Sequence, residues 1–148
     1  MSATTIRVSA DVPAPAERVF RRLSDLDAHR DLASPGIEVL SLHGRRGART
    51  GGLVRLNGPL GVRVMARTRV CDAQFPRLLS GEAATPDGTT ASLAWHLEPR
   101  GRATTVAVVL TARPRSARHR ALLALGGRVW LRRHLATAIR RLGRDTQA

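Results

Sequence analysis

Apolar and polar residues alternate along several stretches of this chain, and such alternation is the pattern of a half-buried β-strand. The first stretch places Ile6, Val8 and Val12 on one face and charged or hydroxyl-bearing residues on the other. Clusters of Gly, Pro and Asp between stretches are typical of turns. The predicted strands are residues 5–12, 37–42, 53–56, 62–71, 78–85, 90–98 and 104–112.

Two short helices are predicted directly after the first strand. Pro13 and Pro15 end that strand, Pro15 suits the first turn of a helix, and Glu17 favours the helix dipole there. Residues 16–23 then form the first helix. Residues 24–33 form the second, which the sequence Ser-Pro-Gly at 34–36 ends.

The end of the chain carries the pattern of a long amphipathic helix, because Leu131, Leu135, Ala138, Ile139 and Leu142 recur at helical spacing and share a face. We expect this apolar stripe to be buried against the sheet.

The sequence also indicates where this helix starts and where it is interrupted. Ser116 fits the N-cap position, with Ala117 as the first helical residue. Further along, Gly126-Gly127 is unfavourable in a helix interior, so it indicates a kink, a close approach to the sheet or a simple break.

Together these elements predict an α+β fold. A curved antiparallel sheet of about six or seven strands surrounds a long C-terminal helix, and two short helices follow the first strand. The helix is needed because the apolar face of such a sheet requires a cover. We expect one domain over residues 1–148, with an ordered core of about 4–143 and a cavity between sheet and helix.

Composition narrows the class of protein. The apolar fraction is 43%, charges interrupt every apolar run near the N-terminus, and the apolar runs elsewhere are too short to span a bilayer. The single cysteine, Cys71, excludes an internal disulfide and is expected to be buried. These features predict a soluble, cytoplasmic protein.

The charge of the chain points to anionic partners. Its formal net charge is +14, and the segment from Arg113 to Arg144 contains no acid. Because acids are favoured at a helix N-terminus, an external anion is expected near Ser116. The predicted anion-binding residues are Arg113, Arg115, Arg118 and Arg120. A solvated basic surface without a specific partner is the alternative.

Catalytic signatures are absent from the sequence. The chain has no lysine, which excludes a Walker phosphate loop, and its five histidines lack metal-binding spacing. The glycine-rich segment 44–52 is expected to be a loop. We therefore expect no metal and no cofactor, and the catalytic residues are unknown.

The chain resembles the START-like (SRPBCC) superfamily, in particular its polyketide cyclase/dehydrase branch. The resemblance covers nearly the whole chain in order and rests on residues 12–20, 23–26, 70–79, 95–99, 101–108 and 131–142. Members often carry two tryptophans in the second short helix, where this chain has His29 and Leu32. The pocket mouth is therefore less aromatic here.

The resemblance implies a helix-grip fold, a single START-like domain, and a cavity for a polyketide- or lipid-like molecule. The candidate lining residues are Val64, Ala66, Thr68, Leu93, Trp95, Leu97, Val106, Val108 and Trp130. Arg55 and Asn57 join them if their face of the strand points inward, in which case Arg55 could pair with a carboxylate or enolate.

Three questions stay open at the level of sequence. The protein could be a carrier or a cofactor-independent cyclase/dehydratase. It could instead be a basic module that binds RNA, the ribosome or an anionic membrane, although the absence of tyrosine argues against base stacking. The apolar segment 121–125 could contact a lid loop or a second subunit, so a homodimer is possible.

Overall fold

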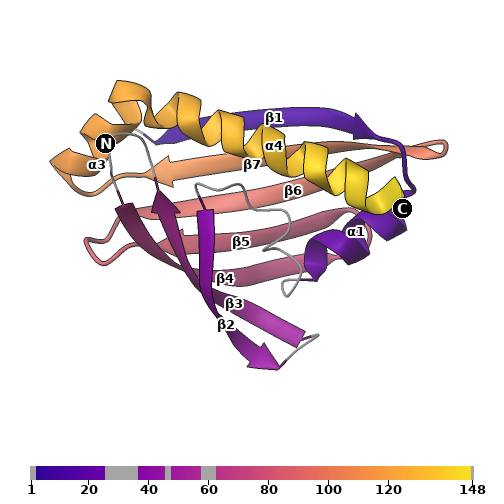
Figure 1. Ribbon diagram of the computed structural model, residues 1–148, viewed down its shortest axis with the longest axis horizontal. Coiled ribbons are helices and arrows are strands. Elements are labelled where there is room, and N and C mark those ends of the chain that lie inside the picture. The colour runs from indigo at the N-terminus through magenta and orange to yellow at the C-terminus, as the bar shows by residue number, and fades with distance from the viewer. Residues whose placement is uncertain (1–2, 26–36, 46–47, 58–62, 148) are drawn as a thin grey trace.

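The computed structural model describes residues 3–25, 37–45, 48–57 and 63–147, and its elements follow one another as the strand and helix patterns predict (Figure 1). The strands are β1 Thr4–Val12, β2 Ile37–Arg45, β3 Ala48–Asn57, β4 Arg63–Gln74, β5 Leu78–Ala84, β6 Thr90–Arg100 and β7 Ala103–Arg113. The helices are α1 Ala16–Ser24, α3 Ala117–Leu122 and α4 Arg128–Gln147, and a π-helical segment, Leu123–Gly127, joins the last two. The second predicted short helix lies outside the described residues, apart from its first two positions.

The strands form one antiparallel sheet of seven, in the order β1-β7-β6-β5-β4-β3-β2. The first strand therefore pairs with the last, and α4 runs along these two strands (Figure 1). At the opposite edge of the sheet, β2 and β3 run at a steep angle to them. This arrangement confirms the predicted α+β helix-grip architecture.

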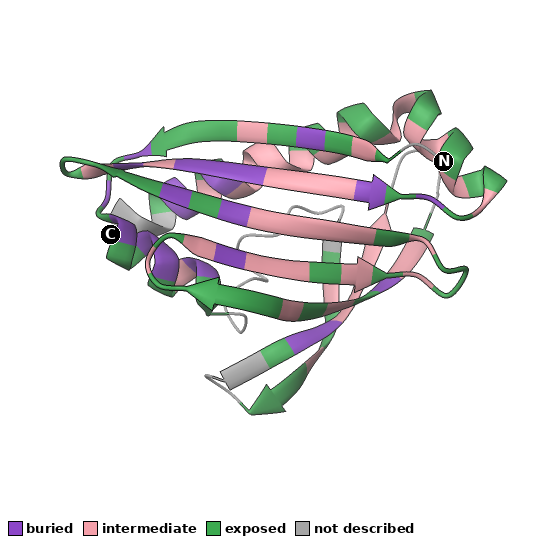
Figure 2. Cartoon of the chain, turned by 180° about the vertical axis from the view of Figure 1, so that it is seen from behind, coloured by how far each residue is buried: buried purple, intermediate pink, exposed green. Residues whose placement is uncertain are grey.

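One face of the sheet, which we call the inner face, carries the core. Residues paired directly across neighbouring strands share a face, and Val8, Val108, Trp95 and Leu79 make one such apolar row. Buried positions concentrate where this face meets the helices (Figure 2). The row packs in one cluster with Leu142 and its neighbours on α4.

The predicted helical stripe is largely confirmed. Ile139 and Leu142 are buried, Leu135 and Ala138 pack against the same cluster while partly buried, and Leu131 is half-buried. None of the helices in the described ranges has the length and apolarity that crossing a membrane requires.

The terminal helix is not continuous, as one reading of the glycine pair predicted. Leu125 has non-helical dihedrals (φ −97°, ψ 31°) and Gly126 has a φ of 118°, a conformation that only glycine adopts without strain. A Cβ on Gly127 would lie 2.5 Å from the Leu122 carbonyl oxygen. The glycines therefore permit a sharp break between α3 and α4, and the close approach is to the preceding turn of helix.

The glycine-rich segment expected to be a loop instead belongs mostly to strands β2 and β3. A Cβ on Gly51 would lie 2.1 Å from the Thr68 carbonyl oxygen, and one on Gly52 would lie 2.3 Å from that of Ser41. These glycines allow neighbouring backbones to approach closely, which is one reason for glycine inside a strand. The prediction failed because glycine normally weakens a strand signal.

The two edge strands differ in how their backbone is protected. Arg132 of α4 donates from Nη1 to the carbonyl oxygen of Arg7 on β1 at 3.2 Å. On the opposite edge, the pairing of β2 with β3 shifts register twice, between Val39 and Ser41 and between His43 and Gly44.

Candidate functional site

The inner face of the sheet is only partly covered by α4. Val106 and Val108, on the strand that α4 follows, are fully buried. Val64, Val70 and Leu93, which lie on the same face of more distant strands, are only half-buried. The inner face therefore keeps a partly exposed apolar surface beside α4.

Eight predicted pocket residues lie on this inner face, as the strand register places them together. Five of them are buried: Ala66, Trp95, Leu97, Val106 and Val108. Three are half-buried and thus better placed to meet a ligand: Val64, Thr68 and Leu93. The Thr68 hydroxyl accepts from the Gly52 amide at 3.1 Å and donates to its carbonyl oxygen at 3.2 Å, so it is engaged within the sheet.

Trp130, the ninth predicted pocket residue, lies on α4. Its ring lies 4.1 Å from that of His134, centroid to centroid, and both residues are half-buried. Each lies two residues from Arg132, hence about 200° around the helix. Since Arg132 reaches β1, Trp130 and His134 lie on the flank directed across the rest of the inner face.

Burial lowers the pKa of His134 below its ordinary value, so the neutral imidazole is favoured at this position. A neutral imidazole can accept a proton or a hydrogen bond. In the sequence this histidine showed only that it lacks metal-binding spacing, and the one further signal was its position four residues after Trp130, on the same side of the helix.

Arg55 and Asn57 lie on the other face of the sheet. Arg55 pairs in register with Met65, whereas the inner face carries the neighbouring Val64 and Ala66. The Arg55 guanidinium contacts the Glu38 carboxylate at 2.5 Å, and Asn57 donates to the same carboxylate at 3.2 Å. The condition for a ligand-binding role of these two residues is therefore not met.

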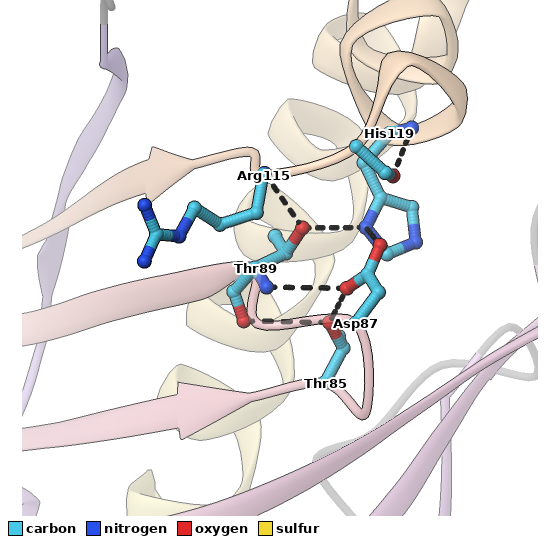
Figure 3. A network of polar contacts seen from close by, with 6 residues as sticks. Thr85, Asp87, Thr89, Arg115 and His119 are labelled. Carbon is cyan, nitrogen blue, oxygen red and sulfur yellow. Dashed lines mark hydrogen bonds and ion pairs between the residues drawn. The ribbon is translucent and has the colours of Figure 1, made fainter.

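The N-terminus of α3 carries the predicted cap. The Ser116 hydroxyl accepts from the His119 amide at 3.1 Å, and Ala117 is the first helical residue. The acid missing from this stretch of sequence comes from the turn between β5 and β6, because the Asp87 carboxylate lies 3.0 Å from Nδ1 of His119 (Figure 3). Because Asp87 supplies a negative charge at this helix end, the charge argument no longer calls for an external anion there.

Asp87 is held by a network of hydrogen bonds. Its carboxylate accepts from the Thr85 hydroxyl, from Ser116, and from the Thr89 amide at 3.1 Å (Figure 3). These bonds, that of Thr85 first, hold the pKa of Asp87 well below its usual range. We call Asp87, Thr89, Ser116 and His119 the clasp, since they fasten α3 to the β5–β6 turn.

The clasp is not arranged as a nucleophile–base–acid relay. The Thr89 hydroxyl and the Asp87 carboxylate both contact Nδ1 of His119, at 2.6 and 3.0 Å. A relay requires the nucleophile and the acid to use different ring nitrogens. The Thr89 hydroxyl also accepts from the Arg115 amide at 3.0 Å, which supports a structural role.

The four arginines of the predicted anion site are all exposed. Arg113 ends β7, while Arg115, Arg118 and Arg120 lie before and within α3. Arg113 contributes to an open groove of about 470 Å³, as do Arg67, Arg69 and Glu82, whose row of side chains lies on the outer face. Thr68 is the single predicted pocket residue that borders it. Charged and alanine side chains both line the groove, and Arg69 pairs with Glu82 at 2.9 Å.

Cys71 was expected to be buried, but it is exposed. It lies at a register shift in β4, between Val70 and Asp72, where the extra residue leaves the regular alternation. A bulge of this kind has no clear signal in the sequence.

The chain matches the family model described as "Polyketide cyclase / dehydrase and lipid transport" over residues 3–146. No curated protein matches it.

Solved structures share the fold along almost the whole chain. A crystal structure of a protein from Thermus thermophilus is 22% identical, with a TM-score of 0.72 and coverage of 97% of each chain. A conserved protein from Geobacillus kaustophilus is 15% identical, with a TM-score of 0.74 and coverage of 97% of this chain and 95% of the other. The ZhuI aromatase/cyclase from a Streptomyces species is 17% identical, with a TM-score of 0.72 and coverage of 99% and 94%.

Proposed function

Because this chain belongs to the polyketide cyclase/dehydrase and lipid transport family, we propose that it binds an apolar small molecule between the inner face of the sheet and α4. A polyketide- or lipid-like compound fits this proposal. The similarity to an aromatase/cyclase agrees with the same class of ligand.

The observation that carries the proposal is the incomplete burial of the inner face. Val64, Val70 and Leu93 are apolar and point to the side on which the core lies, yet they remain half-buried. Fully burying one such side chain contributes roughly 1.5–3 kcal/mol. Because these residues are already half-buried, an apolar ligand that covers them would gain part of this free energy on binding.

His134 and Trp130 supply the other wall of the proposed site. The indole offers a broad apolar surface, and the neutral imidazole offers an acceptor for a hydroxyl or enol of the ligand. If the bound molecule is transformed as well as carried, His134 is placed to take its proton. Such chemistry would need no cofactor.

The experiment uses two neighbours on β4 that face opposite ways. Val64 lies on the inner face and Met65 on the outer face, and both are half-buried. Binding of Nile red, an uncharged apolar fluorophore, is measured by its fluorescence in the wild type, Val64→Phe and Met65→Phe. The larger ring in Val64→Phe should occupy the site and weaken binding about tenfold or more, equivalent to about 1.4 kcal/mol.

Met65→Phe should bind Nile red as the wild type does. Urea unfolding of both variants checks that neither result reflects a loss of the fold. Equal weakening by the two substitutions, or none by either, would reject a site on the inner face. Turnover of a polyketide substrate that His134→Gln abolishes, with Nile red binding intact, would identify an enzyme rather than a carrier.

A further inference from the structure

The break between α3 and α4 exposes an apolar surface. We call residues 121–129 the elbow. Its exposed apolar residues are Ala121, Ala124, Leu125 and Val129. Leu125 is 84% exposed and Val129 57% exposed, which is unusual for large aliphatic side chains. The elbow lies at one end of the molecule, beyond the end of β7 (Figure 1).

Positive charge surrounds this apolar surface. Arg118, Arg120 and Arg128 are exposed on either side of it, and no acid occurs between Arg113 and Arg144. Asp87 does approach α3, but the clasp binds it to Ser116 and His119, in the N-terminal half of that helix. The elbow therefore presents exposed aliphatic side chains flanked by arginines.

We propose that the elbow docks on the surface of an anionic lipid bilayer. Leu125 and Val129 enter the boundary between headgroups and acyl chains, and Arg118 and Arg128 bind lipid phosphates. This combination of an apolar apex with flanking cations is the chemistry by which peripheral helices recognise anionic membranes.

The composition of the elbow favours a bilayer over other partners. Recognition of RNA bases uses aromatic side chains, whereas the exposed residues here are alanine, leucine and valine. A second copy of this chain would bring two sets of arginines together, and like charges repel. An anionic bilayer complements both the charge and the apolar apex.

The fold holds the elbow in place for such contact. The clasp fastens α3 to the β5–β6 turn, and the buried stripe of α4 fixes the other arm to the core. The left-handed conformation of Gly126 turns the chain between them. Little ordering of the chain is then needed on binding, which favours affinity.

The test is co-sedimentation with vesicles. Wild-type protein is mixed with vesicles of phosphatidylcholine and phosphatidylglycerol in equal parts, and separately with pure phosphatidylcholine. Leu125→Ser should weaken binding to the mixed vesicles about tenfold, because it removes the aliphatic side chain that enters the bilayer. The double variant Arg118→Gln/Arg128→Gln should weaken it roughly 25-fold, at about fivefold for each arginine.

Matched controls make the same chemical changes elsewhere. Leu40 is an exposed leucine on β2, Arg63 is an exposed arginine on β4, and Arg77 is an exposed arginine in the turn between β4 and β5. Leu40→Ser and Arg63→Gln/Arg77→Gln should each stay within about twofold of wild type. These controls distinguish an effect of the elbow itself from an effect of lowering the protein's exposed apolar area or its net charge at any position.

Three outcomes would overturn the proposal. The first is binding by the elbow variants that equals that of the controls. The second is binding to single-stranded RNA that the elbow variants lose while wild type ignores both kinds of vesicle. The third is a dimer in sedimentation velocity that Leu125→Ser dissociates, again without vesicle binding. Nile red binding by Leu125→Ser should remain normal, so failure here is distinct from failure of the proposed ligand site.

Discussion

At the scale of single residues, Asp87 is the group whose surroundings say most about how the molecule is held together. It is one exposed carboxylate on a turn, yet it contacts Thr85, Thr89, Ser116 and His119. It also places a negative charge beside the N-terminus of α3, where the helix dipole favours one. The clasp thus depends on a residue outside the helix that it secures.

We predict that Asp87→Asn destabilises the protein at neutral pH and destabilises it less in acid. Because the folded-state pKa of Asp87 is lowered, its contribution is complete above the unfolded value of 3.8, declines as the pH falls below that value, and is lost only as the pH falls through the lower folded-state pKa. Urea unfolding at pH 7 and pH 3 measures the difference between variant and wild type. Asp72 is an exposed residue of β4, and Asp72→Asn is the control for the same change in charge.

A difference in stability that persists unchanged at pH 3 would mean that the charge of the Asp87 carboxylate is not what matters.

The Ser116 cap could be predicted because its partner amide is three residues away in the sequence. Asp87 could not, because its contact with α3 depends on how β5, β6 and β7 align. The ligand-binding role considered for Arg55 could not be decided from the sequence for a related reason. Alternation within a strand does not say which face is inward.

At the scale of elements, the division of the terminal helix is decided by two glycines that have different roles. Gly126 supplies a backbone conformation, with a φ of 118°, and nothing lies within 4 Å of a Cβ added there. Gly127 supplies space, because a Cβ there would collide with the Leu122 carbonyl. The two substitutions to alanine therefore test different physical requirements.

We predict that Gly126→Ala and Gly127→Ala both destabilise the protein, each by about 1–2 kcal/mol. Gly143, inside α4, provides the contrast, because its added Cβ would meet only Val12 methyl groups at 3.9 Å. Gly143→Ala should stabilise the protein by about 0.4–1 kcal/mol. Thermal unfolding of the three variants checks the order. Stabilisation by Gly127→Ala would show that α4 can start one turn earlier.

Strand and helix positions could be predicted closely where the periodicity is strong. The segments of β1, β4, β6 and β7 were placed almost correctly, as was α1. The hairpin between β2 and β3 was missed in part, because its glycines serve backbone approach rather than a turn. Local pattern describes what a segment prefers, whereas the spacing between neighbouring backbones is a property of the assembled sheet.

At the scale of the whole molecule, one cluster joins both ends of the chain. Val12 of β1, Phe20 of α1, Trp95 of β6 and Leu142 of α4 belong to it. The first and last elements therefore cannot be separated from the centre of the sheet. The family resemblance made this architecture predictable, since it covers the chain from end to end, whereas the ligand and its exact contacts are not encoded in the pattern.

We predict that Leu142→Ala lowers the free energy of unfolding by about 2–5 kcal/mol, because Leu142 is fully buried. Leu125→Ala makes the same chemical change at an exposed position and should alter stability by no more than about 0.5 kcal/mol. Urea denaturation of both variants gives the comparison. Similar losses for the two would contradict the assignment of the buried stripe.

The protection of the edge strands has a consequence for association. An open sheet ends in two strands whose backbone groups could pair with another copy and extend the sheet indefinitely. Arg132 occupies a carbonyl oxygen on one end strand, and the two register shifts of β2 break the regular backbone spacing of the other. Growth by strand addition is thereby hindered at both ends, so the sheet can remain open without seeding fibres.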